Sequence, residues 1–307
     1  MPLDLTLKAS ACVYAEVDGK QYVGGGVFIT NEGHLLTAAH VVSTSLKKKA
    51  TRVLTYIGGK LYTSNKIYID GVADLAIVKF NAKTPYLEFA NYYARIGSTC
   101  YICGNPMGVD ALSISRGVVR DNKFVCGQGR GAPKVETIMI DASGVYGNSG
   151  GPIVDSRNKI IGIYTLGFTR TDNMGGGPSA LICRHIVKHL KSKDYREKKF
   201  LGIDYRIVSA FDLEKYYKKK NPPIKGVIIT RVDKESPFPL KKNDLLFEMN
   251  GITLGNQLDQ RSPSLFFYCK KNSILIKWIR GYKKYKTRVN LTKTFADVDI
   301  KHDAYDV

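Results

Sequence analysis

The strongest constraint on the fold is a regular alternation of short apolar runs and turn residues between residues 10 and 185. The runs are rich in Val, Ile, Tyr and Thr, are broken by Gly, Asn and Pro, and show almost no long helical periodicity. Strands are predicted at Ala11–Val17, Gly26–Thr30, Leu35–Ala38, Arg52–Ile57, Leu75–Phe80, Thr99–Cys103, Ser113–Arg120, Thr137–Ile140, Pro152–Val154 and Ile160–Leu166. This spacing predicts an all-β sandwich or barrel of Greek-key type.

A second region with a different rhythm follows. Residues 184–191 place Ile186, Val187 and Leu190 on one helical face, and the charged stretch 191–199 is the best candidate linker. Beyond it, strands are predicted at Gly226–Val232, Asp244–Met249, Ser273–Arg280 and Tyr285–Leu291, with a turn at Asn250-Gly251 and a helix over Ser262–Tyr268. A chain of 307 residues is long enough for two domains. The sequence therefore predicts a β-rich domain and a small α+β module.

The positive charge is concentrated in the second region. Residues 191–294 hold 25 Lys and Arg against 10 Asp and Glu, whereas residues 1–190 hold 21 against 13. The last thirteen residues are acidic. Such a field favours weak association with polyanions, although a solvated basic surface is the simpler interpretation.

The start of the chain carries Asp4 and lacks a basic patch followed by an apolar stretch, so it does not resemble a secretory signal. No apolar run approaches the length of a membrane span. We therefore expect an intracellular protein, or a virion-packaged one if the source is viral.

Six cysteines in 307 residues do not form a disulfide framework. Cys100 and Cys103 form a Cys-x-x-Cys pair, but no second pair lies at metal-ligand spacing. We expect buried free thiols, and no motif implies a metal or an organic cofactor.

Three segments carry the residue types that acyl transfer by a serine requires: a nucleophile with donors for the oxyanion, a base and an orienting carboxylate. Gly147-Asn-Ser-Gly-Gly-Pro152 holds Ser149 in a glycine-rich turn, in which the amides of Gly147 and Ser149 can point at one spot. Thr37-Ala-Ala-His40 places a histidine after small residues. Asp74 opens the apolar strand Leu75–Phe80. The chain order His, Asp, Ser is that of the chymotrypsin fold.

Each of these residues has a rival in the sequence. His34, His185, His189 and His302 lack the small-residue context of His40. Asp70 lies four residues before Asp74, but it precedes Gly71 and is typical of a turn residue. Ser143 and Ser156 lie near Ser149 without the flanking glycines.

The sequence resembles the HtrA proteases in four blocks that occur in the same order: Gly24–Val42, Asp74–Phe80, Gly104-Asn-Pro-Met-Gly108 and Asp141–Tyr164. The resemblance implies a two-barrel chymotrypsin-like serine protease domain over residues 1–190. It implies that His40 is the general base, Asp74 its orienting acid and Ser149 the nucleophile. The oxyanion hole would consist of the amides of Gly147, Asn148 and Ser149.

The substrate pocket is expected to be uncharged. In chymotrypsin-fold proteases the residue six before the nucleophile lies at the base of this pocket, and here it is Ser143. No carboxylate is present there to pair with Arg or Lys, so we expect cleavage after aliphatic or other uncharged residues. Tyr146, Tyr164 and Thr165 are the other expected lining residues, with Tyr146 narrowing the pocket.

Residues 199–292 resemble the PDZ domain that follows the protease in HtrA proteins. The matching stretches are Phe200-Leu-Gly-Ile203, Gly226–Val232, Ser236-Pro237 and Asn243–Gly251. Leu201, Gly202 and Ile203 would form the loop and strand that receive a peptide C-terminus. Residues 293–307 form an acidic tail, whose Ala304-Tyr-Asp-Val307 end has the form of a PDZ ligand.

The sequence therefore predicts a serine endopeptidase that acts on proteins or peptides, including unfolded ones, and whose PDZ domain binds peptide C-termini to recruit substrates or regulate the enzyme. The alternatives are a non-catalytic, chaperone-like peptide-binding scaffold and a polyanion-binding protein on a protease fold. A homo-oligomer is compatible with the sequence but not implied by it.

Overall fold

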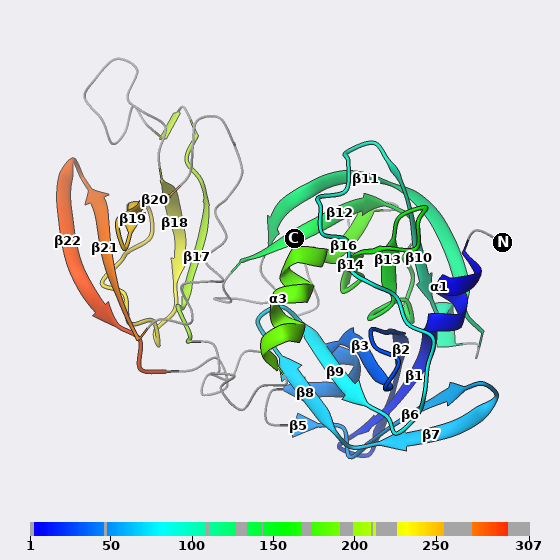
Figure 1. Ribbon diagram of the computed structural model, residues 1–307. Helices are drawn as coiled ribbons and strands as arrows, with labels where there is room; N and C mark the ends of the chain where they lie inside the picture. Colours follow the sequence, from blue (N-terminus) through cyan, green and yellow to red (C-terminus); the bar gives the residue numbers. More distant parts are fainter. Residues whose placement is uncertain are drawn as a thin grey trace. The chain divides into compact units, whose positions relative to one another are not determined.

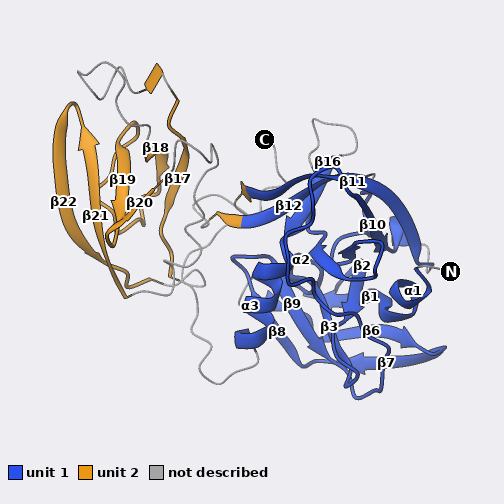
Figure 2. Ribbon diagram, turned by 45° about the horizontal axis from the view of Figure 1, so that its top comes forward, with its two compact units in different colours: residues 1–124, 136–195, 304–307 blue, residues 125–135, 196–303 orange. Residues whose placement is uncertain are grey.

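The computed structural model describes residues 3–45, 48–108, 111–126, 134–142, 144–167, 174–190, 199–209, 211–212, 226–254 and 272–293. Two compact units are distinguished in Figure 2: the larger takes in residues 1–124 and 136–195, and the smaller residues 125–135 and 196–303. Each unit is described by itself.

The first half of the larger unit is a seven-stranded antiparallel sheet (Figure 1). Its strand order is β7 (Lys60–Ser64), β6 (Arg52–Ile57), β1 (Ser10–Val17), β2 (Lys20–Phe28), β3 (His34–Ala38), β9 (Leu75–Lys79) and β8 (Ile67–Asp70). Beside it, β4 (Ser43–Ser45) pairs with β5 (Lys48–Lys49). Buried side chains alternate along β1, so one face of that strand packs into a core that includes Val13, Leu35 and Phe80.

The second half is another seven-stranded sheet, which curls around its own core. Its order is β14 (Ile160–Ile163), β13 (Pro152–Val154), β10 (Thr99–Gly104), β11 (Ser113–Cys126), β12 (Val135–Asp141), β16 (Met174–Pro178) and β15 (Leu166–Gly167). Ile102, Ile138, Ile140 and Ile153 are buried in this core. The two sheets confirm the predicted two-barrel all-β fold.

Helices are few in the larger unit: α1 (Asp4–Ala9), α2 (Ala39–Val42), a 3-10 turn η1 (Pro106–Gly108) and α3 (Ala180–Leu190). The buried residues of α3 are spaced three or four apart, as an amphipathic helix requires. The prediction of a helix near residues 184–191 is confirmed, although α3 begins four residues earlier.

The described residues of the smaller unit form one sheet. Its strand order is β17 (Ile203–Ile207), β18 (Val227–Val232), β19 (Leu245–Met249), β21 (Ser273–Arg280) and β22 (Lys283–Asn290), with β20 (Ile252–Thr253) paired to β19. Asn250 and Gly251 both have positive φ angles and form the two-residue loop of the β19–β20 hairpin, as predicted. Buried Asp244 accepts two hydrogen bonds from Arg280, at 2.8 and 2.6 Å. The predicted helix over 262–268 lies outside the described residues.

The sequence prediction omitted several short elements, among them α1, β7, β8 and β16. The first three are short, and β16 is Met-Gly-Gly-Gly-Pro, a composition that argues against a strand when the sequence is considered alone. No disulfide joins any two of the described cysteines. Cys100, Cys103 and Cys183 are buried thiols, as expected, whereas Cys12 and Cys126 are only half-buried. Burial raises the pKa of Cys100 to about 12 and that of Cys103 to about 11, so both thiols stay protonated. Among the described helices none has the length and apolarity of a bilayer span.

Candidate active site

His40 and Asp74 meet because the strands that precede and follow them are paired. His40 lies in α2 directly after β3, and Asp74 directly precedes β9, with Ala38 opposite Leu75 in the β3–β9 ladder. The amide of His40 donates to Asp74 Oδ1 at 2.9 Å, and the ring Nδ1 lies 2.6 Å from Oδ2. Both carboxylate oxygens therefore hold the same residue.

The buried carboxylate of Asp74 orients the imidazole ring of His40 through Nδ1. The side chain of Asp74 is 5% exposed, whereas that of His40 is 37% exposed, which leaves part of the ring open to an incoming group. Burial of His40 lowers its pKa, but the charge of Asp74 and the hydrogen bond to it outweigh this effect, so the pKa is raised above the ordinary 6.5.

The rival Asp70 has a different role. Its carboxylate is buried and accepts the amides of Val72 and Ala73 at 3.1 and 3.0 Å, which is a local turn of the kind expected from the sequence. Of the two aspartates, Asp74 is the one hydrogen-bonded to His40.

Ser149 is held close to the same strands by the glycines around it. Its carbonyl accepts the amide of Gly25 in β2 at 2.8 Å. A Cβ atom on Gly150 would lie 2.2 Å from Thr37 Oγ1 and 2.3 Å from the carbonyl oxygen of Gly25. The turn can therefore dock against β2 and β3, which lead to His40, only because residue 150 has no side chain.

Sequence reasoning overlooked the partner of this turn, the run Gly24-Gly25-Gly26. A Cβ on Gly24 would lie 2.7 Å from the carbonyl of Ser149, and one on Gly25 would lie 3.0 Å from Gly151. Consecutive glycines inside a strand are typical of close backbone approach, so this pattern could have indicated the contact.

A tight turn precedes the serine. The amide of Asn148 donates to the carbonyl of Val145 at 3.1 Å, and Gly147 has a φ of 94°. These features are those of a type II turn, which needs glycine at its third position.

The turn corrects one expected oxyanion donor. Asn148 cannot offer its amide to an oxyanion in this arrangement, because Val145 already accepts that hydrogen. Within the described part of the chain, the amides of Gly147 and Ser149 donate to no backbone carbonyl. The candidate donors are therefore Gly147 and Ser149.

The expected pocket residues lie in contrasting environments. Tyr146 is 73% exposed, so its ring is not packed into the core. Tyr164 and Thr165 are buried beside the nucleophile turn, where Gly150 donates to the Tyr164 carbonyl at 2.7 Å. Ser143 lies outside the described residues.

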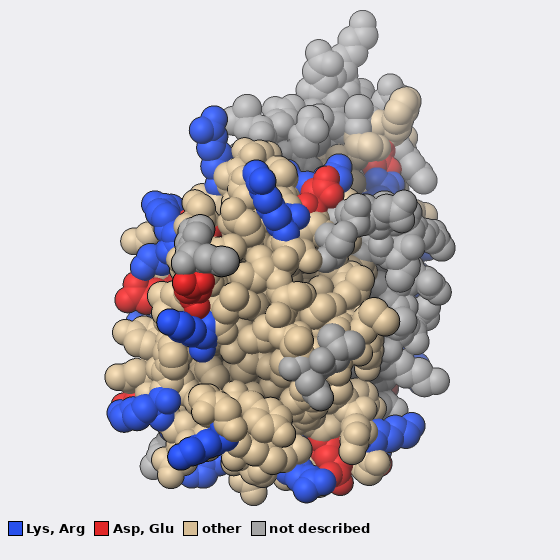
Figure 3. Space-filling view, turned by 90° about the vertical axis from the view of Figure 1, so that its right-hand side faces the viewer, with Lys and Arg blue, Asp and Glu red and all other residues tan. Residues whose placement is uncertain are grey.

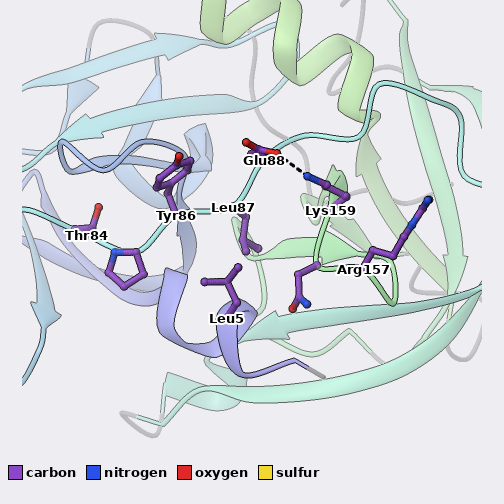
Figure 4. A pocket seen from close by; sticks show the side chains of 9 residues that line it. Leu5, Thr84, Tyr86, Leu87, Glu88, Arg157 and Lys159 are labelled. Carbon is purple, nitrogen blue, oxygen red and sulfur yellow. Dashed lines mark hydrogen bonds and ion pairs between the residues drawn. The ribbon is translucent and has the colours of Figure 1, made fainter. Parts of the chain in front are cut away.

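A hollow of about 410 Å³ lies on another part of the larger unit (Figure 4). It is lined by Leu5 of α1, by residues 84–88 and by residues 157–159. Its two basic side chains are paired, Lys159 with Glu88 at 2.5 Å and Arg157 with Asp155 at 3.1 Å. None of its lining residues belongs to the His40, Asp74 and Ser149 set.

On the face that Figure 3 shows, the described Lys and Arg side chains do not form a continuous basic patch that could bind a polyanion. Lys and Arg there are interspersed with Asp and Glu around a largely uncharged centre. No group of three or more His, Cys, Asp or Glu side chains in the described ranges is arranged to hold a metal ion.

In the smaller unit, the expected peptide-binding residues lie at the start of edge strand β17. Ser236 Oγ donates to the Leu201 carbonyl at 2.8 Å, and the Asp233 amide donates to the Gly202 carbonyl at 2.8 Å. A trans peptide group directs its C=O and N–H to opposite sides. The N–H groups of Gly202 and Ile203 therefore point away from the 233–236 turn.

Comparisons with known proteins agree with this geometry. Residues 24–163 match the trypsin-like peptidase domain family. A probable periplasmic DegP-like serine endoprotease of Chlamydia trachomatis is 26% identical over 287 residues, which is 88% of this chain and 54% of the relative. An HtrA-like serine protease of Staphylococcus aureus is 28% identical over 296 residues, 88% of this chain and 37% of that protein. The structure of the HtrA-type protease AlgW with a tripeptide superposes with a TM-score of 0.65 at 18% identity, covering 94% of this chain and 95% of the other.

These relatives correct the expected location. DegP-like proteins of two other Chlamydia species and of Bartonella henselae are, like the first, named periplasmic, which points to an extracytoplasmic protein and not to an intracellular one. The expectation rested on the beginning of the sequence, and the chain spans only about half the length of its Chlamydia relatives. The chain therefore contains a trypsin-like peptidase domain over residues 24–163, and the relatives and structures it resembles are DegP-like and HtrA-type serine proteases.

Proposed function

We propose that the chain is a serine endopeptidase in which His40, Asp74 and Ser149 form the catalytic triad. The observation that carries this proposal is the two-point hydrogen bonding between Asp74 and His40, next to a glycine turn that presents Ser149. A carboxylate on Nδ1 fixes the proton on that nitrogen, so Nε2 is left with its lone pair as the base.

The reaction then follows from these positions. Nε2 of His40 accepts the hydroxyl proton as Ser149 Oγ attacks the scissile carbonyl carbon, and the carbonyl oxygen becomes an oxyanion. The imidazolium gives this proton to the leaving amine as the C–N bond breaks, which leaves an acyl-enzyme. Water, deprotonated by His40, attacks the ester, and Ser149 recovers its proton when the carboxylic acid leaves.

The oxyanion would be stabilised by the amides of Gly147 and Ser149. The type II turn supports this role because it uses the Asn148 amide internally and leaves the two flanking amides for a ligand. Preorganised donors of this kind account for a factor of about 10²–10³ in kcat each.

Substrates are proposed to be proteins or peptides, including unfolded ones, cleaved after uncharged residues. The relatives give no support to a non-catalytic scaffold or to a polyanion-binding protein, since they are named as serine proteases or endoproteases. A direct test is to incubate an unfolded protein such as β-casein with the enzyme and with Ser149→Ala. Cleavage by the parent alone supports the proposal, and equal cleavage or none by both folded proteins would refute it.

The domain arrangement is proposed as a protease over 1–190, a PDZ domain over 199–292 and a tail over 293–307, which lies almost entirely outside the described residues. Edge strand β17 supports a peptide-binding role, because the N–H groups of Gly202 and Ile203 point away from the 233–236 turn. In this proposal the two groups form a cradle for a terminal carboxylate. Fluorescence anisotropy with a peptide that ends in Val should detect binding, and the same peptide with an amidated end should bind at least about tenfold more weakly. Equal binding of both would refute the carboxylate cradle.

A further inference from the structure

Tyr164 is fixed directly beside the nucleophile turn. It follows β14, and its amide donates to the Gly151 carbonyl at 2.9 Å while its carbonyl accepts the Gly150 amide at 2.7 Å. These two bonds join Tyr164 to Gly150 and Gly151, the two residues that follow Ser149. The position of the Tyr164 side chain is therefore set by the same backbone that sets the nucleophile.

The phenol ring fills a space that three glycines leave open. A Cβ on Gly144 would lie 1.9 Å from the Tyr164 hydroxyl oxygen, one on Gly175 would lie 2.5 Å from it, and one on Gly167 would lie 3.2 Å from it. One edge of the ring faces Gly144, since Cε1 lies 2.8 Å from that Cβ position. The other edge faces Gly175, with Cε2 at 2.7 Å.

These glycines belong to the walls of a single space. Gly167 of β15 is paired with Gly175 of β16, and Gly144 lies five residues before Ser149 on the chain that leads into the nucleophile turn. The base of the ring packs on the core of the second sheet, and the residue is only 4% exposed. The ring thus extends from the core into this space and closes the end of the space that lies against the core.

We infer that the Tyr164 phenol forms the floor of the primary substrate pocket and restricts the residue before the scissile bond to small uncharged side chains, such as Ala and Ser. The inference rests on the proposed protease function and narrows it, because glycine walls alone would admit a large side chain. The tyrosine ring fills the space that the missing side chains of these glycines leave.

The floor is polar but uncharged. Burial raises the pKa of Tyr164 to about 12, so the phenol stays neutral over the range in which a protease is assayed. A neutral hydroxyl offers a basic side chain such as Arg or Lys no countercharge.

The test compares cleavage of four peptides that differ only in the residue before the scissile bond, which is Ala, Val, Leu or Phe. The parent enzyme, Tyr164→Ala, Tyr164→Phe and the distant surface control Tyr56→Ala are compared. Labelling of each protein with a small fluorophosphonate counts the competent active sites. One methylene in excess in such a pocket costs about 10–200-fold in kcat/KM.

We expect the parent to cleave the Ala peptide at least about tenfold faster than the Leu and Phe peptides. Tyr164→Ala should lose or reverse this preference, whereas Tyr164→Phe, which keeps the ring, and Tyr56→Ala should retain it. If Tyr164→Ala does not fold, a preference for Ala in the parent and in Tyr164→Phe still supports the inference, and a preference for Leu or Phe in either one overturns it.

Two further outcomes separate this inference from the proposed function. If every variant is labelled and the preference is the same in Tyr164→Ala as in the parent, the protease stands and the role of Tyr164 is refuted. If the folded parent is not labelled at all, the proposed function fails, and the inference that rests on it fails too.

Discussion

Replacing Asp74 by Asn removes the charge that orients His40 and changes little else. Asp74 has a φ of 53°, in the left-handed region that asparagine tolerates almost as readily as aspartate, so the variant adds little backbone strain. An alanine at this position would combine the loss of the carboxylate with such strain, which makes Asn the sharper variant.

The expected loss follows from the two hydrogen bonds. In the parent, one oxygen accepts the His40 amide at 2.9 Å and the other faces Nδ1 at 2.6 Å. An asparagine has one oxygen and one NH₂ group. If the oxygen faces Nδ1 of His40, the NH₂ group faces the His40 amide, and two donors oppose each other. If the NH₂ group faces Nδ1, that nitrogen must accept a hydrogen bond, and the ring proton moves to Nε2. That tautomer cannot accept the serine proton. We expect labelling by a fluorophosphonate to slow by about 10⁴, which is about 5 kcal/mol of transition-state stabilisation.

The assay is the second-order rate constant of labelling, followed by intact mass, with urea denaturation to show that each variant is folded. Asp70→Asn is the matched control, because Asp70 is equally buried but serves a turn, where an asparagine oxygen can still accept the amides of Val72 and Ala73. A folded Asp74→Asn labelled within tenfold of the parent rate, or an equal loss in Asp70→Asn, would refute this account of the triad.

Three further predictions concern pH, packing and the smaller unit. The labelling rate should rise with pH through a midpoint above 6.5, because His40 acts as a base only when neutral and its pKa is raised; a midpoint below 6.5 would contradict the assigned effect of Asp74. Gly150 has a φ of 89°, and a Cβ atom there would lie 2.2 Å from Thr37 Oγ1, so Gly150→Ala should lower the free energy of unfolding by about 2–5 kcal/mol. The control Gly58→Ala also has a positive φ but open space around it, and should lower the free energy of unfolding by only about 1–2 kcal/mol. Equal losses in a urea titration would contradict the docking of the turn. Arg280→Ala should destabilise the smaller unit by about 2–3 kcal/mol, less than a fully buried pair because Arg280 is partly exposed, and Arg280→Lys should recover part of the loss; an unchanged urea midpoint in Arg280→Ala would contradict this.

The parts of the fold that the sequence predicted well are those with an unambiguous period or turn. The strand at 152–154, the strand at 52–57 and the strand at 273–280 match the structure residue for residue. Apolar β-branched residues bounded by turn residues leave few other options there. By contrast, β16 is mostly glycine, and its pairing with β12 and β15 depends on partners that are distant in sequence.

The candidate site shows the same division. The residue types of His40, Asp74 and Ser149 could be chosen from local sequence, and the structure brings His40 and Asp74 into contact through the β3–β9 ladder. The engaged Asn148 amide could not be foreseen, because it depends on the turn type that Gly147 adopts. Likewise, sequence alone could not tell exposed Tyr146 from buried Tyr164, since burial depends on where each ring points in the folded sheet.

The central claim, an assembled triad on Ser149, is tested most directly by fluorophosphonate labelling of the purified chain and of Ser149→Ala, read by intact mass. The account predicts one adduct on the parent and none on the variant, with the adduct mapped to the peptide that contains Ser149. A folded parent that takes up no adduct, or a variant labelled as fast as the parent, would contradict it.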